Sequence, residues 1–261
     1  MEENTQWLQT LKDRPEIARD FCHANDYELV PYLVEDGRKH PVAILCPGGG
    51  YGMVCSYVEG EPFARQLNRM GIHALVVYYR VREKARFPAP QDDLARAVRE
   101  AHDRAEEWNL DMRNYSVWGS SAGGHLAASF GTETMGYAKY GLPQPGAMVL
   151  IYPVVTMGPL THEGTRENLL GNHPTEEQIA MTSVEQQVTA AYPPTFLWTG
   201  DADQAVPPDN SRMLAAALKE RNIHCRLEVY PGVDHGAGLG IGLACEGWLE
   251  QAVDFWQSLS A

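Results

Sequence analysis

The stretch YSVWGSSAGGHL, residues 115–126, contains two adjacent serines among small residues. Gly119, Ser121 and Gly123 satisfy the pattern G-x-S-x-G. Small residues two positions before and after a serine allow a strand to turn sharply into a helix, which exposes the hydroxyl as a nucleophile. We therefore predict that Ser121 is a catalytic nucleophile and that Ser120 supports the turn. A glycine-rich helix N-terminus that binds an anion, or simply packs tightly, would explain the same residues.

A second glycine-rich segment could supply the oxyanion hole that acyl transfer requires. The residues LCPGGGYG, 45–52, end a strand-like run, and consecutive glycines let backbone N–H groups approach a substrate closely. We expect the N–H groups of Gly49 and Gly50, with that of Ala122 directly after the nucleophile, to hold the developing charge. This segment does not satisfy G-x-G-x-x-G, and G-x-x-x-x-G-K-[ST] occurs nowhere in the chain, which disfavours a nucleotide-binding loop.

An acid and a base follow later in the chain, each directly after a strand-like run. The segment TGDADQAVPP, 199–208, offers Asp201 and Asp203, which position alone does not separate. An aspartate-rich turn at a strand end would explain both. His235 lies in YPGVDHGAGLG, 230–240, among glycines that leave room for its ring. The resulting order of nucleophile, acid and base is the one found in α/β-hydrolases.

Other histidines compete for the role of base. Three of them lie in predicted strands or helices before the last strand and are expected to be structural: His73, His102 and His125. His162 and His173 fall in the polar stretch 156–190, which is long for a connection. If that stretch is an insertion packed over the site, these two histidines could touch the substrate. A surface excursion without function is the other interpretation.

Short apolar, β-branched runs alternate with helical patterns along the chain. The predicted strands cover residues 41–50, 72–80, 114–119, 147–155, 195–200 and 225–232. The predicted helices cover residues 91–108, 122–131, 211–222 and 247–259. This alternation indicates parallel pairing with right-handed crossovers, hence a doubly wound, mostly parallel α/β sheet. We expect one domain over residues 1–261, with a possible cap-like insertion at 156–190 and a site at the carboxyl ends of the strands.

Composition narrows the class of function. Of the 261 residues, 44% are hydrophobic and 21% are charged, as in an ordinary globular domain. The formal net charge of −13 disfavours a nucleic-acid or anionic-membrane partner. The five cysteines are scattered without a C-x-x-C pair, so we expect reduced thiols, a cytoplasmic protein and no metal site. The polar N-terminus, 1–21, has no signal-peptide core, and no apolar run is long enough to span a membrane.

Several further segments carry a family resemblance. They are PGGGY (47–51), EGEPFARQL (59–67), YYRV (78–81), PAPQDDLARAVR (88–99), WGSSAGGHLAA (118–128), PPTFLWTGDADQAVPPDNS (193–211) and HGAGLG (235–240). In these segments the chain resembles α/β-hydrolase-fold esterases related to hormone-sensitive lipase, especially small bacterial carbohydrate acetyl esterases often labelled acetyl xylan esterase. The aspartate three residues before Val-Pro in that group matches Asp203, so the resemblance implies Asp203 as the acid and Asp201 as a turn residue. Pro47 stands where hormone-sensitive lipases carry histidine, which favours the sugar-esterase branch.

The resemblance implies a serine carboxylesterase that uses Ser121, His235 and Asp203 and needs no metal or organic cofactor. Its expected substrate is a small ester, above all an acetylated sugar. We expect Tyr51 and Tyr57 to line the substrate cleft, because aromatic rings suit the faces of pyranose sugars. A serine peptidase of the prolyl-oligopeptidase type and a non-catalytic ligand-binding module on the same fold are the alternatives. The complete set of nucleophile, acid and base disfavours the module.

Overall fold

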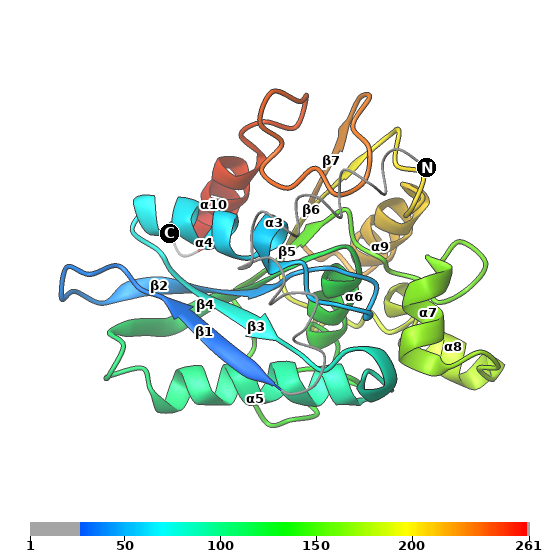
Figure 1. Ribbon diagram of the computed structural model, residues 1–261, viewed down its shortest axis with the longest axis horizontal. Coiled ribbons are helices and arrows are strands. Elements are labelled where there is room, and N and C mark those ends of the chain that lie inside the picture. Colours follow the sequence, from blue (N-terminus) through cyan, green and yellow to red (C-terminus); the bar gives the residue numbers. More distant parts are fainter. Residues whose placement is uncertain (1–26, 260–261) are drawn as a thin grey trace, which may run out of the picture.

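The computed structural model describes residues 27–259, in which seven strands form one sheet (Figure 1). The strands are β1 Glu28–Tyr32, β2 His40–Cys46, β3 His73–Tyr78, β4 Leu110–Ser120, β5 Ala147–Ile151, β6 Thr195–Gly200 and β7 Cys225–Tyr230. Their order across the sheet is β1-β3-β2-β4-β5-β6-β7. β1 pairs antiparallel with β3, and the other neighbouring strands pair in parallel. The predicted mostly parallel, doubly wound sheet is confirmed.

Helices connect the strands, as the sequence pattern predicts. They are α3 Ser56–Glu59, α4 Glu61–Arg69, α5 Ala89–Asp103, α6 Ser121–Phe130, α7 Glu163–Leu170, α8 Glu176–Thr182, α9 Asp209–Glu220 and α10 Trp248–Ser258, with short 3₁₀ turns η1 Arg82–Lys84 and η2 Val184–Gln186. All predicted strands and helices are present, with ends shifted by a few residues, but α3, α4, α7 and α8 were not predicted. The prediction missed β1, because this edge strand is only partly buried and contains Pro31, so it lacks a continuous apolar run.

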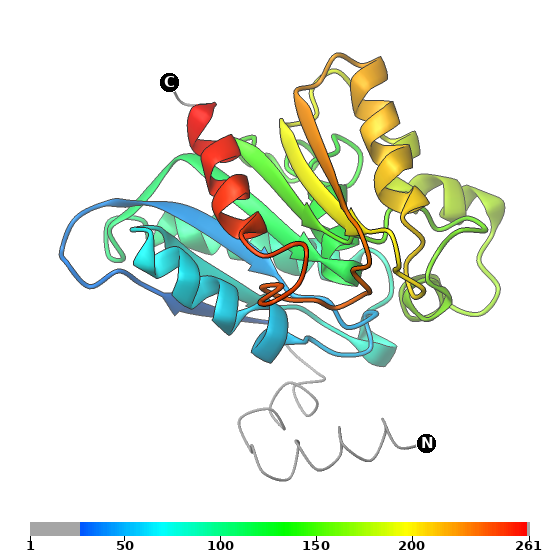
Figure 2. The same ribbon diagram turned by 90° about the horizontal axis from the view of Figure 1, so that it is seen from above.

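The order of the strands decides which face each helix covers. The chain runs from β2 outward to β3, then back past β2 to β4, β5, β6 and β7. Because crossovers between parallel strands are right-handed, this reversal moves the connecting helices to the other face. α4 therefore covers one face, and α5, α6 and α9 cover the opposite one (Figures 1 and 2). α10 returns to the face of α4, where Gln66 donates to the Glu250 carboxylate at 2.7 Å.

Residues 156–190 form α7, α8 and η2 beyond the carboxyl ends of β5 and β6 (Figure 1). The buried Asn210 of α9 anchors the start of this segment, because its Oδ1 accepts the N–H groups of Val155 at 2.9 Å and Thr156 at 3.2 Å. Asn168 of α7 donates to the carbonyl of Gly50 at 2.9 Å. The segment is thus fixed against the glycine-rich loop.

Some predictions concern the ends of the chain and the cysteines. The N-terminal segment 1–21 and Cys22 lie outside the described residues. The cysteines within residues 27–259 carry free thiols: Cys46 and Cys245 are buried, and Cys55 and Cys225 are partly exposed. In this same range no helix combines the length and apolar character needed to cross a membrane.

The histidines expected to be structural lie in regular elements, His73 on β3, His102 on α5 and His125 on α6. His125 is completely buried; its Nε2 lies 2.7 Å from the Thr182 carbonyl and its Nδ1 lies 2.9 Å from the Tyr51 hydroxyl. Because a carbonyl only accepts, Nε2 carries the proton and Nδ1 accepts from the hydroxyl. Burial lowers the pKa of His125 from 6.5 to about 4, and the bond to the carbonyl opposes this shift.

We predict that His125 makes the free energy of unfolding depend on pH. Between pH 6.5 and about 4 the unfolded chain binds a proton that the folded protein excludes. The folded state therefore loses roughly 3 kcal/mol as the pH falls through this window, and it keeps the full contribution above it. A His125→Gln variant, less stable at pH 7, should lack this component. Urea unfolding of both proteins at pH 7 and pH 4 measures it, and an equal loss in the two proteins would contradict the prediction.

Candidate active site

Ser121 is the first residue of α6, directly after β4, and its backbone φ is +52°. This left-handed conformation is strained for any residue with a side chain. Neither glycine that flanks Ser121 in the motif has room for a Cβ. On Gly119 it would lie 2.1 Å from the carbonyl oxygen of Gly123, and on Gly123 it would lie 2.1 Å from the carbonyl oxygen of Cys46. The glycines of the motif are therefore required by close backbone contacts. Ser121 is 8% exposed, whereas Ser120 is 1% exposed.

His235, in the loop after β7, lies between the other two predicted residues. Its Nε2 is 2.8 Å from the Oγ of Ser121, and its Nδ1 is 2.7 Å from the Oδ2 of Asp203. Because a carboxylate only accepts, Nδ1 carries a proton and Nε2 can accept the proton of the serine hydroxyl. The ring of Tyr152 packs edge-on against the imidazole, with 5.0 Å between centroids. Three residues from separate segments thus form one hydrogen-bonded chain.

The two aspartates after β6 have different surroundings. Asp203 is 3% exposed, and its second oxygen accepts the backbone N–H groups of Ala205 at 3.0 Å and Val206 at 2.8 Å. Asp201 is exposed and accepts the N–H of Gly232 at 2.7 Å. Asp203 therefore holds the imidazole, and Asp201 ties together the loops after β6 and β7. This is the distinction that the family resemblance implied.

The N–H groups expected to form the oxyanion hole lie next to Ser121. Gly49 and Gly50 follow β2 with φ values of +122° and +63°, and both line the same cavity as Ser121. Within residues 27–259 no protein acceptor takes either of their N–H groups. Ala122 is the second residue of α6, where a helix leaves N–H groups without an internal partner. All three N–H groups are therefore available to an anion.

Hydrogen bonds to neighbouring carbonyls set the direction of two of these donors. The Gly48 carbonyl accepts the N–H of Cys55 at 2.9 Å, and the Gly49 carbonyl accepts those of Gly52 at 2.9 Å and Met53 at 3.1 Å. In a planar trans peptide the C=O and the following N–H point in opposite directions. Each carbonyl bond therefore directs the N–H of the next residue, Gly49 or Gly50, away from the loop's own turn.

A cavity of about 460 Å³ opens above the serine. It is lined by Gly49, Gly50, Met53, Cys55, Tyr57, Val58, Glu59, Ser121, His162, Gly164, Asn168, His235 and Gly236. Its walls come from the glycine-rich loop, α3, the start of α7 and the His235 loop. A volume of this size suits a small ligand. Tyr57 lies on the wall, at the place expected for it.

Tyr51 lies elsewhere, and the prediction that it lines the cleft is wrong. Its side chain is completely buried, and its hydroxyl is bonded to Nδ1 of His125 at 2.9 Å. Its ring packs edge-on against Tyr79, with 5.7 Å between centroids. Because Tyr51 has a left-handed backbone, with φ of +57°, directly after the glycines, its side chain enters the core instead of the cavity.

Polar residues outside the predicted triad and oxyanion hole complete the cavity. His162 lines it, whereas His173 is not among its lining residues. The Nδ1 of His162 accepts the N–H of Thr165 at 3.2 Å, so the neutral ring carries its proton on Nε2. Burial lowers the pKa of His162, and the nearby His235 lowers it further. Glu59 and Asn168 also line the cavity, and each forms a hydrogen bond with the glycine-rich loop. No motif in the sequence links either residue to that loop.

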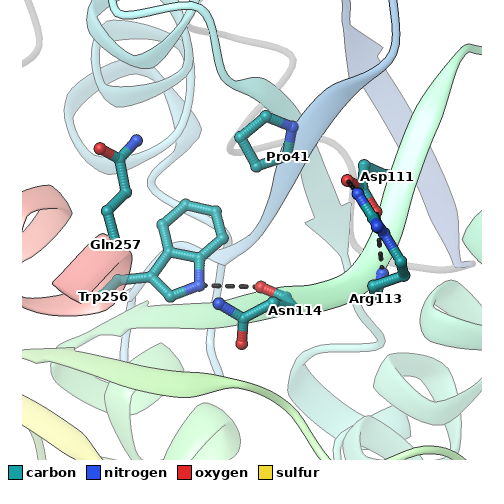
Figure 3. A pocket seen from close by; sticks show the side chains of 6 residues that line it. All are labelled: Pro41, Asp111, Arg113, Asn114, Trp256 and Gln257. Carbon is teal, nitrogen blue, oxygen red and sulfur yellow. Dashed lines mark hydrogen bonds and ion pairs between the residues drawn. The ribbon is translucent and has the colours of Figure 1, made fainter. Parts of the chain in front are cut away.

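A second hollow, of about 500 Å³, lies near the amino ends of β2 and β4, at the other end of these strands from Ser121 (Figure 3). It is lined by Pro41, Asp111, Arg113, Asn114, Trp256 and Gln257. Asp111 and Arg113 pair with each other, and the Trp256 N–H donates to the Asn114 carbonyl at 2.8 Å. No serine, histidine or cysteine lines it. Nor do the described residues include a cluster of three His, Cys, Asp or Glu side chains that could hold a metal ion.

The sheet order and the strand–turn–helix at Ser121 define an α/β-hydrolase fold. The acetyl ester-xyloside bifunctional hydrolase from Caldicellulosiruptor lactoaceticus has the same fold. Its TM-score is 0.81 at 33% sequence identity, over 90% of this chain and 88% of that one. The sequence pattern of the BD-FAE family matches residues 32–218. The chain belongs to the BD-FAE family.

Curated relatives agree with this assignment. The chain is 34% identical to endo-1,4-beta-xylanase B of Butyrivibrio fibrisolvens over 88% of its own length and 38% of the relative. It is 30% identical to the acetylxylan esterase of Xylanibacter ruminicola over 86% of its own length and 49% of the relative. The chain thus spans half or less of each of these relatives. The resemblance to α/β-hydrolase-fold esterases that the motifs indicated is confirmed.

The turn at Ser121 leads to a prediction about stability. In a Gly123→Ala variant the new methyl group would meet the carbonyl oxygens of Cys46 and Pro47, which are backbone atoms that cannot rotate away. We expect the free energy of unfolding to fall by about 3 kcal/mol or more. Gly158→Ala is the matched control, because there a Cβ meets only the Thr156 hydroxyl at 3.2 Å. Urea unfolding of both variants measures the difference, and equal stabilities would contradict the prediction.

Proposed function

We propose that the protein is a serine carboxylesterase that removes short acyl groups, above all acetyl, from carbohydrate or other small esters. The observation that carries this proposal is the chain from Ser121 through His235 to Asp203, with distances of 2.8 and 2.7 Å, at the wall of a cavity. Such a chain activates a serine hydroxyl at neutral pH. The names of the similar proteins, an acetylxylan esterase and an acetyl ester-xyloside bifunctional hydrolase, support the acetyl group and the carbohydrate.

The proposed reaction is a two-step acyl transfer. His235 takes the proton of Ser121 as the serine oxygen attacks the ester carbonyl carbon, and Asp203 stabilises the resulting imidazolium. The N–H groups of Gly49, Gly50 and Ala122 hold the charge that develops on the carbonyl oxygen. The alcohol then leaves with the proton from the imidazole. Water, activated by the same histidine, attacks the acyl-enzyme and releases the carboxylic acid.

The cavity supports a short acyl group joined to a polar alcohol. Met53 and Val58 offer apolar surface, while His162 and Asn168 place polar groups on the same cavity. A neutral imidazole with its proton on Nε2 is a hydrogen-bond donor that suits a sugar hydroxyl. Tyr57 adds an aromatic ring to the wall. A volume of about 460 Å³ is small for a long acyl chain together with its alcohol.

The first experiment compares the wild type with Ser121→Ala in the hydrolysis of p-nitrophenyl acetate. We expect kcat to fall by about 10⁴-fold to 10⁶-fold, because the variant has no oxygen to form the acyl-enzyme. Ser120→Ala is the control; Ser120 is buried beside the nucleophile, and its loss should leave kcat within about tenfold. Equal rates in the wild type and Ser121→Ala would refute the proposed nucleophile. Acetylated xylo-oligosaccharides then test the carbohydrate.

The two aspartates after β6 provide a matched pair of variants. Asp203→Asn should lower kcat by about 10⁴-fold, because an amide at this place no longer holds the imidazole in the required tautomer. Asp201→Asn should leave kcat within about tenfold, since the Asp201 carboxylate accepts the N–H of Gly232, whereas the imidazole is held by Asp203. Steady-state kinetics with p-nitrophenyl acetate measure both. A larger loss in Asp201→Asn than in Asp203→Asn would reverse the assignment of the acid.

A further inference from the structure

A buried carboxylate lies inside the candidate active site and takes no part in the mechanism above. Glu59, at the end of α3, is 5% exposed and lines the same cavity as Ser121 and His235. A Cβ built on Gly48 would lie 2.8 Å from the Oε2 of Glu59 and 2.8 Å from the Cβ of Ser121. The carboxylate and the nucleophile are therefore both close neighbours of Gly48.

Two hydrogen bonds fix this carboxylate. Its Oε2 accepts the N–H of Gly48 at 2.6 Å, and its Oε1 accepts the hydroxyl of Tyr152 at 2.7 Å. That hydroxyl in turn accepts the N–H of Gly238, in the loop after His235, at 3.3 Å. Each carboxylate oxygen faces a donor, which stabilises the ionised form. Burial raises the pKa of Glu59 above its ordinary value, and the two hydrogen bonds and the nearby His235 offset only part of this rise.

Apart from His235, no side chain on the described walls of the cavity balances this charge with a positive one. The lining residues include no lysine or arginine, and burial lowers the pKa of His162, which keeps that ring neutral at pH 8. Like charges repel strongly in a partly dehydrated cavity. At a separation of about 6 Å and an effective dielectric constant of about 20, the repulsion corresponds to roughly 100-fold in a rate or equilibrium constant.

We propose that Glu59 is a specificity-determining residue, whose fixed negative charge disfavours esters with an anionic group near the scissile bond and favours neutral or cationic ones. The inference rests on the proposed esterase function. For carbohydrates, it means that acetyl groups on neutral sugars are removed faster than acetyl groups beside a uronic acid carboxylate. The bonds to Gly48 and Tyr152 keep the charge in place during the reaction.

Two pairs of isosteric acetate esters test charge separately from shape. One pair is 4-acetoxybenzoate and the neutral 4-acetoxybenzamide, and the other is acetylcholine and the neutral 3,3-dimethylbutyl acetate. We would measure kcat/KM at pH 8, corrected for the alkaline hydrolysis rate of each ester. The proteins are the wild type, Glu59→Gln and Glu61→Gln. Glu61 is the matched control, because it also loses one negative charge but is more exposed, and it pairs with Arg65 on the outside of α4.

The wild type should prefer 4-acetoxybenzamide over 4-acetoxybenzoate by about tenfold or more. In Glu59→Gln this preference should shrink at least about fivefold, and the preference for acetylcholine over its neutral isostere should shrink as well. Glu61→Gln should leave both ratios unchanged. In Glu59→Gln the kcat/KM of the anionic ester should therefore rise, and that of the cationic ester should fall, each relative to its neutral partner. A merely structural defect would not move the two ratios in opposite directions.

Three results would overturn the proposal. One is an equal fall of all four rates in Glu59→Gln with unchanged ratios, which would mean that the carboxylate only supports the fold. Another is a wild type whose kcat/KM does not differ between charged and neutral esters. This result needs only the wild type, so it can be obtained even if Glu59→Gln does not fold. The third is a wild type that hydrolyses none of the four esters, which would refute the proposed esterase function and this inference with it.

Discussion

The contact between the turn at Ser121 and the end of β2 constrains the rest of the structure most tightly. Carbonyl oxygens occupy the places where side chains would start at Gly119 and Gly123, so α6 packs directly against the backbone of β2 and β4. Ser121 keeps a left-handed backbone that costs on the order of 1–3 kcal/mol. The burial of every residue of α6 offsets this cost. A side chain at either glycine would push the helix away and move the hydroxyl off the strand edge.

The strand order then determines what can meet that hydroxyl. The chain leaves β2 toward β3 on one side, whereas β4 leads to β5 on the other, so the loops after β2 and β4 diverge and leave a crevice between them. The glycine-rich loop and Ser121 lie on the two sides of this crevice. The loops after β6 and β7 reach the same edge because all these strands are parallel, and they bring Asp203 and His235 to it. Residues more than a hundred positions apart in the chain therefore meet without any long-range signal in the sequence.

Features that follow directly from a strand end could be predicted from the sequence. Ser121, His235 and the pair Asp201 and Asp203 each follow a strand, and parallel pairing is enough to place such residues at one edge; the choice of Asp203 came from the family resemblance. The direction of a side chain after several glycines could not be predicted, because glycines permit many backbone conformations; Tyr51 therefore turned out to lie in the core. Glu59 was missed for a different reason. Its partners, Gly48 and Tyr152, lie on other loops, and nothing in its own segment marks a buried carboxylate.

The glycine-rich loop connects these observations, since its donors are oriented before any substrate arrives. The carbonyls of Gly48 and Gly49 are held by backbone N–H groups within the loop, and peptide planarity then fixes the N–H groups of Gly49 and Gly50. Contacts from outside the loop hold both of its ends, because Glu59 accepts the N–H of Gly48 and Asn168 of α7 donates to the carbonyl of Gly50. Donors that are already oriented need no reorganisation when charge develops on a substrate oxygen. Helix α7 and the buried carboxylate therefore act on the same loop, α7 by hydrogen bonding alone and the carboxylate by hydrogen bonding and charge.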